Sequence, residues 1–163
     1  MTKYVLSIDG GGVRGLASAT FLSELDKAVP KKLSESFDLI VGTSTGGIIA
    51  LAISILDLQK DDLVQIYSKE NIKRIFSPFR YRVFGSKYAG KVKRKVFKEY
   101  FKSETLEAAK IPTMITAFDL EKRRVKMFKS WTEGYLPARR VAAATSAAPT
   151  YFPAESLEGQ WYI

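Results

Sequence analysis

The chain has 163 residues, about the length of one ordinary domain and enough to bury a substantial core. It contains no cysteine and no histidine. Their absence excludes a disulfide scaffold, thiolate and imidazole metal ligands, a cysteine nucleophile and a complete Ser-His-Asp triad. Because histidine is absent, any hydrolytic chemistry must use a carboxylate or a lysine as its base. The 26 lysines and arginines outnumber the 17 acids and give a net charge of +9.

Strands alternate with helices along the hydrophobic pattern. It predicts a strand over residues 4–8, a helix over 16–29, a strand over 37–41, helices over 45–56, from 61 and over 92–100, strands over 112–118 and 125–128, a small alanine-rich helix over 139–148, and a last strand over 160–163. This order predicts one α/β domain with a largely parallel central sheet.

The first motif is Gly42-Thr43-Ser44-Thr45-Gly46, which fits G-x-S-x-G at the junction of a predicted strand and a predicted helix. The glycines permit a tight turn, so the serine hydroxyl projects from the end of the sheet. The following helix directs its N-terminal N–H groups toward charge that develops there. The pattern predicts Ser44 as a nucleophile, and a connection that merely needs small residues is the alternative.

The second motif, Asp9-Gly10-Gly11-Gly12-Val13-Arg14-Gly15, follows the first predicted strand. Consecutive glycines expose backbone N–H groups in a concave loop, which an oxyanion hole requires. Gly10, Gly11 and Gly12 are therefore candidate oxyanion donors, and the N–H of Thr45 is a further one. Arg14 braces the loop or contacts a phosphate, or it forms only a surface salt bridge.

The same loop also satisfies G-x-G-x-x-G, the dinucleotide-binding pattern, through Gly10, Gly12 and Gly15. That fold places an acid at the end of the second strand. Here Asp38 lies at the start of the second predicted strand, and the serine motif occupies its end. A nucleotide-binding oxidoreductase remains the alternative enzyme class.

Together the two motifs resemble the patatin-like phospholipase family, which has Asp-Gly-Gly-Gly-x-Arg-Gly near its N-terminus and Gly-x-Ser-x-Gly some thirty residues later. Residues 142–153, Ala-Ala-Ala-Thr-Ser-Ala-Ala-Pro-Thr-Tyr-Phe-Pro, are similar to the stretch before that family's second catalytic block. The resemblance covers nearly the whole chain. It implies a three-layer α/β/α hydrolase fold and a serine acyl hydrolase, of the phospholipase A or lipid acyl hydrolase type, that cleaves fatty-acyl esters.

The resemblance also implies a Ser-Asp dyad without histidine, in which Ser44 attacks the acyl carbonyl and an aspartate takes its proton. The family's aspartate lies in an Asp-Gly-Gly or Asp-Gly-Ala motif after a strand such as 160–163, whereas the only Asp-Gly-Gly here is residues 9–11. We therefore expect a domain over 1–163 that is incomplete at its C-terminus, with the dyad aspartate beyond Ile163 and little activity on its own. Supporting motif residues are Asp9, Gly15, Gly42 and Gly46, and the residues imply no metal or cofactor.

Positive charge is concentrated in residues 69–102, which contain twelve lysines and arginines and only two acids. Within this stretch, five aromatic residues interleave with cations: Phe76, Phe79, Tyr81, Phe84 and Tyr88. One interpretation is a lip that inserts aromatic rings among headgroups and binds anionic lipid. The other is a solvated basic face whose aromatic rings lie in the core.

The partners expected from these features are a phospholipid or other acyl-lipid substrate and an anionic membrane surface. Nothing resembles a nucleic-acid-binding motif. Residues 39–56 carry no charge, but the glycine turn divides them into a strand and a helix, and no signal peptide is predicted. We expect a cytoplasmic protein with peripheral membrane contact. The non-enzymatic alternative is a basic lipid- or nucleic-acid-binding module in which the serine is idle.

Overall fold

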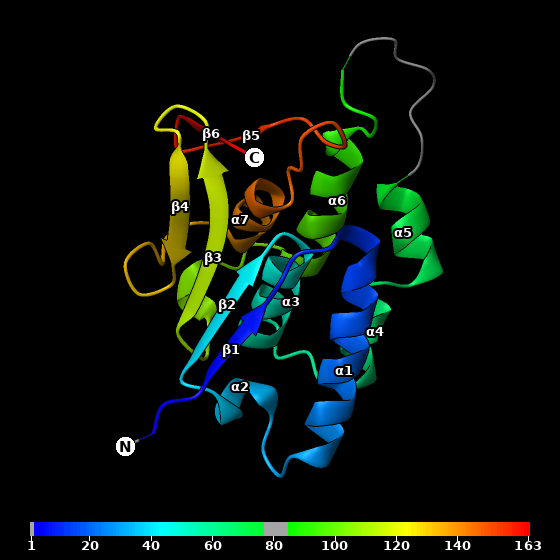
Figure 1. The fold of residues 1–163 in the computed structure, drawn as a ribbon, viewed down its shortest axis with the longest axis vertical. Helices are drawn as coiled ribbons and strands as arrows, with labels where there is room; N and C mark the ends of the chain where they lie inside the picture. The colour runs from blue at the N-terminus through cyan, green and yellow to red at the C-terminus, as the bar shows by residue number, and fades with distance from the viewer. Residues whose placement is uncertain (1, 77–84) are drawn as a thin grey trace.

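The fold was analysed in a computed structural model that describes residues 2–76 and 85–163 (Figure 1). Its strands and helices in chain order are β1 Val5–Ile8, the 3₁₀ turn η1 Gly12–Arg14, α1 Gly15–Ala28, α2 Leu33–Ser36, β2 Leu39–Thr43, α3 Thr45–Ser54, α4 Asp61–Gln65, α5 Lys69–Ile75, α6 Gly90–Phe101, η2 Leu106–Ala108, β3 Thr113–Asp119, β4 Arg124–Lys129, α7 Ala138–Thr145, β5 Glu155–Leu157 and β6 Gln160–Tyr162. Every predicted element is present, with its ends shifted by a few residues. The short elements α2, α5 and β5 were not predicted.

The strands form one sheet in the order β1-β2-β3-β6-β5, with β4 also paired to β3. β1, β2 and β3 are parallel to one another, whereas β4 and β6 run antiparallel to β3 and β5 runs antiparallel to β6. The α/β class is confirmed, but the sheet is mixed rather than largely parallel. The reason lies in the short β3–β4 and β5–β6 connections, because a parallel crossover needs a dozen or more residues.

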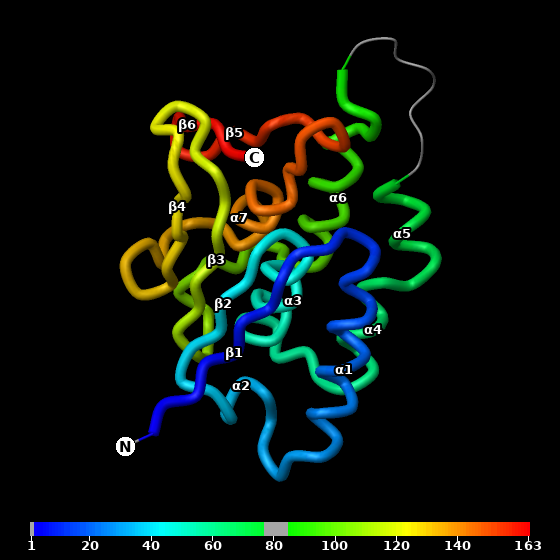
Figure 2. Tube along the Cα trace, in the orientation of Figure 1, coloured from blue at the N-terminus to red at the C-terminus, as the bar shows by residue number. Residues whose placement is uncertain are grey.

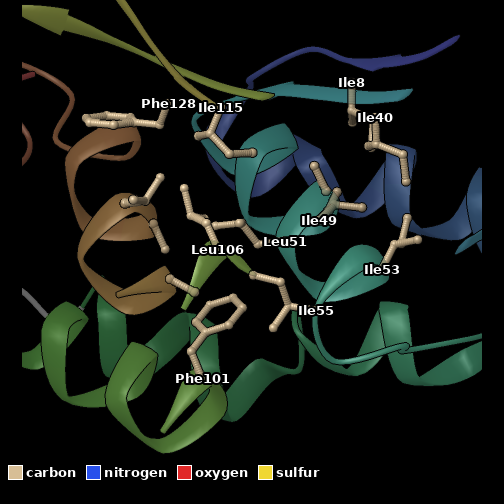
Figure 3. Packing of buried hydrophobic residues seen from close by; sticks show 14 of the residues in the cluster. Ile8, Ile40, Ile49, Leu51, Ile53, Ile55, Phe101, Leu106, Ile115 and Phe128 are labelled. Carbon is tan, nitrogen blue, oxygen red and sulfur yellow. The ribbon is translucent and has the colours of Figure 1, made fainter. Parts of the chain in front are cut away.

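The described helices cover one face of the sheet. Side chains alternate between the faces, so Ile8, Ile40 and Ile115 point into the buried side, against α3 (Figure 3). On the other face, Val125 is 57% exposed and Met127 is 46% exposed. Of the three layers expected, the described residues therefore supply the sheet and one layer of helices.

The centre of the core is α3, which packs against β1, β2 and β3 on one side and against α7 on another. Nine of its ten residues are buried, and its side chains are apolar all round, as expected of a helix enclosed by other elements. Figure 3 shows Phe101 of α6 and Leu106 on the side of α3 away from the sheet. Because α3 starts directly after Ser44, burying this helix also fixes the position of the serine.

β6 lies on the same edge of β3 that β2 occupies earlier in the strand. β4 pairs with β3 from Met114 to Asp119 and takes the other edge throughout. β2 pairs with β3 only as far as Thr116, and beyond it Phe118 and Ile163 exchange two backbone hydrogen bonds of 2.8 and 3.0 Å. The C-terminus therefore lies beside the carboxyl end of β3 (Figure 2), next to the point where β2 leaves the sheet.

Candidate active site

Ser44 occupies the turn between β2 and α3 in a strained backbone conformation, with φ 54° and ψ −123°. A positive φ is rare for a residue with a side chain and costs of order 1–3 kcal/mol, so the surroundings must hold it. The Ser44 carbonyl accepts the Ile48 N–H at 3.0 Å, which is the first bond of the following helix. The geometry is that of a nucleophile elbow, and its sequence signal was G-x-S-x-G.

The glycines on either side of the turn are required by close packing. A side chain at Gly46 would collide with the Ile8 carbonyl of β1, and one at Gly42 would lie 2.5 Å from the Gly46 carbonyl oxygen. Gly10 meets the serine itself: a Cβ there would lie 2.9 Å from the Ser44 Cβ. Both glycine motifs therefore form one site.

The loop before η1 is tied to the elbow by a side chain. The buried Thr45 hydroxyl accepts the Gly11 N–H at 3.1 Å. Gly12 has a φ of 58°, and no atom of the described residues lies within 4 Å of where its Cβ would be. Gly15, which starts α1, packs against the Tyr67 hydroxyl and Thr45. Burial raises the pKa of Tyr67 to about 12, so its side chain remains a neutral phenol beside the elbow.

A second threonine contacts the Ser44 backbone. The Ser44 N–H donates to the Thr145 hydroxyl at 2.7 Å, and that hydroxyl donates to the Thr116 carbonyl at 2.6 Å. The Thr116 hydroxyl in turn lies 2.5 Å from the hydroxyl of Thr43. Sequence analysis placed Thr145 only in a small-residue stretch, and no local pattern indicates that it reaches the elbow.

Ser44 opens into a cavity of about 580 Å³, lined mostly by apolar side chains of α3, α5 and α6 and by aromatic rings. A cavity of this size and apolarity suits a lipid or another largely apolar ligand. Its charged lining residues, among those the structure describes, are both cations: Arg14, exposed at the end of η1, and Lys93 on α6.

Lys93 is an unexpected feature of this cavity because it is only 1% exposed. Its ammonium donates to the Ala143 carbonyl at 3.0 Å and lies 3.7 Å from the buried Glu155 carboxylate and 4.6 Å from the centre of the Phe152 ring. Arg94 contacts the same carboxylate more closely, at 3.1 Å. Burial lowers the pKa of Lys93 to about 8, against the opposing effect of Glu155.

Four acids that could serve as a base by residue type lie in separate environments. Asp38 is at the start of β2, at the opposite end of that strand, where it accepts from Lys3 and the Tyr4 N–H. Glu155 is held by Arg94, and Glu158 is exposed in the turn between β5 and β6. Asp9 is exposed at the end of β1. Within the described residues, no group of three or more acids could hold a metal ion.

The basic segment divides between two environments. Lys91, Lys95 and Lys98 are exposed on α6, whereas Lys93 on the same helix is buried. The basic segment is therefore not the uniformly solvated face of the second interpretation. Phe76 and Tyr88 pack edge-to-face at 5.3 Å in the cavity wall rather than in the core. The other three aromatic residues of the predicted lip, Phe79, Tyr81 and Phe84, lie outside the described residues, as do Arg80 and Arg82.

Residues 6–163 match the family model described as patatin-like phospholipase. The chain belongs to the patatin-like phospholipase family. Patatin-like protein 2 of rice (Oryza sativa subsp. indica) is 30% identical over 94% of the chain and 44% of its own length. The cGAMP-activated phospholipase of Pseudomonas aeruginosa is 32% identical over 93% of the chain and 49% of its own length. Family membership favours the hydrolase over the dinucleotide-binding alternative.

The fold is shared with a solved structure of low sequence identity. VipD from Legionella pneumophila superposes with a TM-score of 0.70 at 9% identity, over 98% of this chain and 45% of that protein. The chain thus spans less than half the length of the patatin relatives and of this structure. Among the described residues, no helix combines the length and apolarity needed to cross a bilayer.

Proposed function

We propose that this patatin-like chain carries the nucleophile half of a serine acyl hydrolase that cleaves fatty-acyl esters of lipids. The observation that carries the proposal is Ser44: a strained elbow serine at the head of a buried helix, opening into an apolar cavity. Ser44 Oγ attacks the acyl carbonyl, the ester bond breaks, and the alcohol leaves with the proton that the base took from the serine. Water then hydrolyses the acyl-enzyme, which releases the fatty acid and restores Ser44. An apolar cavity of about 580 Å³ gives the acyl chain a place to lie during both steps.

The oxyanion is stabilised in this proposal by backbone N–H groups on two sides of Ser44. The Gly10–Gly12 loop lies on one side, and the N-terminus of α3, beginning with the Thr45 N–H, lies on the other. Because the Gly11 N–H already donates to the Thr45 hydroxyl, we assign the donor role in the loop first to Gly12, the next N–H along the loop. Donors fixed in this way need no reorganisation when charge develops.

The general base in this proposal is an aspartate after the strand that ends at Ile163, as the family resemblance implies. The path of β6 supports this assignment. It runs antiparallel to β3, so its end at Ile163 lies opposite Phe118, two residues beyond Thr116 and hence close to the turn that holds Ser44. In this proposal the residues that follow Ile163 bring the aspartate toward the nucleophile.

The test is the Ser44→Ala variant of the full-length protein, assayed with a p-nitrophenyl ester and a fluorophosphonate probe. We expect hydrolysis and labelling to be lost while the circular dichroism spectrum stays unchanged. Ser54→Ala is the matched control, because this buried serine lies at the other end of α3 and its hydroxyl has no hydrogen-bond partner among the described residues. Near-wild-type turnover by Ser44→Ala would refute the proposal.

We also propose that the outer face of α6 contacts anionic membrane. The inner face of this helix lines the cavity through Val96 and Phe97, and its exposed lysines, Lys91, Lys95 and Lys98, lie on the opposite face of the same helix. Each basic residue at an anionic surface contributes about 1 kcal/mol, within a Debye length of about 8 Å at physiological salt. Three such lysines together contribute about 3 kcal/mol toward holding the cavity near its lipid substrate.

Vesicle co-sedimentation tests this contact, with phosphatidylglycerol-containing vesicles at low salt and at 0.5 M salt. We expect binding to weaken steeply with salt and to be reduced by Lys91→Glu with Lys95→Glu. The control carries the same charge change at Lys31 and Lys122, which are exposed outside residues 69–102. Equal binding by both double variants, or salt-independent binding, contradicts the contact.

A further inference from the structure

A side chain interrupts the hydrogen-bond ladder between β2 and β3 at the elbow. In a parallel pair the backbone bonds of one strand recur at every second residue. The Ile40 N–H donates to the Pro112 carbonyl at 3.0 Å, which sets the ladder's starting point. Advancing both strands by four residues assigns the Ser44 N–H to the Thr116 carbonyl, in keeping with the observed register.

That direct bond is replaced by a bridge through Thr145. Its hydroxyl accepts the Ser44 N–H at 2.7 Å and donates to the Thr116 carbonyl at 2.6 Å, so it satisfies both groups that the ladder would have joined. The inserted hydroxyl keeps the Ser44 N–H and the Thr116 carbonyl apart, so the backbone pairing of β2 with β3 ends at Thr43 and does not include Ser44. The serine is then able to leave the extended conformation and adopt its φ of 54°.

We propose that Thr145 is a positioning residue for the nucleophile, with its hydroxyl holding the Ser44 backbone in the elbow conformation. The inference deepens the proposed acyl hydrolase function and rests on it. Without the hydroxyl, the Ser44 N–H and the Thr116 carbonyl either remain unpaired or close the direct bond. Closing it draws Ser44 toward the φ of about −120° usual in a parallel strand and moves its Oγ away from the donor loop.

The support for Thr145 is itself fixed. Thr145 is the last residue of α7, a helix that packs on α3, α6 and β3, and the Lys93 ammonium binds the Ala143 carbonyl just before it. The hydroxyl that holds the elbow thus comes from an element anchored independently of the turn between β2 and α3. A preorganised nucleophile requires such support, because a displacement of about 1 Å can cost roughly 10²-fold in rate.

Steady-state kinetics of the full-length protein test the inference, with a p-nitrophenyl ester as substrate. For Thr145→Val we expect kcat to fall by about 10–100-fold while KM changes by less than about twofold, since the cavity walls are untouched. Thr145→Ser restores the hydroxyl and is expected to recover kcat to within about threefold of wild type. Thr145→Ala, which also lacks the hydroxyl but adds no bulk, replaces the valine variant if that variant fails to fold.

Thr113→Val is the matched control. Thr113 is a buried threonine at the other end of β3, and its hydroxyl donates to a backbone carbonyl, that of Ile111, at 2.9 Å. The Thr113→Val variant should have its free energy of unfolding in urea lowered by an amount comparable to that of Thr145→Val, and it should keep the wild-type kcat. The inference is overturned if Thr145→Val has the same kcat as Thr113→Val, or if Thr145→Ser is no better than Thr145→Val.

The proposed function can fail separately, and Ser44→Ala identifies that case by retaining activity. The positioning role is then decided by amide hydrogen exchange of Ser44, measured by NMR. When the N–H is left unpaired, we expect it to exchange at least about tenfold faster in Thr145→Val than in Thr145→Ser; when the direct bond closes, we expect the Ser44 Cα and Cβ chemical shifts to move to values typical of an extended strand, with the amides of α7 unaffected in both cases. Equal exchange together with unchanged Ser44 chemical shifts in the two variants overturns the inference whatever the protein hydrolyses.

Discussion

Replacing Lys93 by methionine gives a measurable test of how the cavity wall is built. The side chain is nearly the same length, but the ammonium is removed from a site where it is 1% exposed. Burial lowers the pKa of Lys93 from 10.5 to about 8 in the folded protein. In the unfolded chain the group keeps its ordinary pKa, so between pH 8 and 10.5 the unfolded state binds more protons than the folded state.

The sign of the pH dependence follows from this difference. Because the folded pKa is the lower one, the stability penalty of the buried charge is complete below pH 8 and is relieved as the pH rises toward 10.5. For a single group with these two pKa values, the free energy of unfolding rises by about 2–3 kcal/mol between pH 7 and pH 10. The Lys93→Met variant lacks this rise.

The assay is urea unfolding followed by circular dichroism at pH 7, 8, 9 and 10, for wild type and Lys93→Met. Across this range the free energy of unfolding of wild type should rise by about 2–3 kcal/mol relative to that of the variant, because all other titrating groups are common to both proteins. Lys91→Met is the control on the same helix, since its ammonium is exposed to water. A wild-type-to-variant difference that stays within about 0.5 kcal/mol from pH 7 to pH 10 would refute the burial of a charged Lys93.

Three further predictions concern the elbow and the base. Gly46→Ala should destabilise the protein by roughly 1–3 kcal/mol or more in urea unfolding, because the added methyl collides with the Ile8 carbonyl of β1. Thr45→Val should cost about 1 kcal/mol, by removing the acceptor of the Gly11 N–H, and should lower kcat more than it changes KM in the p-nitrophenyl ester assay. Residues 1–163 alone should hydrolyse that ester at least about 100-fold more slowly than the full-length protein, since general-base assistance contributes about 10²–10⁴-fold. Equal rates would place the base within these residues.

The elbow and the glycine loop were predictable because their chemistry is local. A strand, a glycine-flanked serine and an apolar helix occur within 18 residues, 39–56, and each part constrains the next. The same holds for α6, whose apolar positions recur at helical spacing, and for the β3–β4 hairpin. Hydrophobic periodicity and turn residues act over a few residues, and these are the distances over which a single sequence is informative.

The remaining features depend on contacts between distant parts of the chain. Thr145 reaches Ser44 across 101 residues, and Lys93 meets the Ala143 carbonyl across 50. Nothing near Lys93 in the sequence distinguishes it from its exposed neighbours Lys91 and Lys95, because burial is decided by α7 and by Glu155. The coverage of only one face of the sheet by helices was likewise not predictable. The apolar residues on both faces of β3 and β4 indicate a buried sheet but do not show what covers it.

The distance in sequence between the glycine loop and Ser44 has a structural explanation in the register of β1 and β2. These strands are adjacent and parallel, with Ile8 paired to Gly42. β1 ends at that pair and β2 ends one residue later, and the positions two residues beyond the pair are Gly10 and Ser44. Only a residue without a side chain fits at the first, because a Cβ there would lie 2.9 Å from the Ser44 Cβ. The glycine loop and the N-terminus of α3 therefore meet at the serine as a consequence of strand pairing.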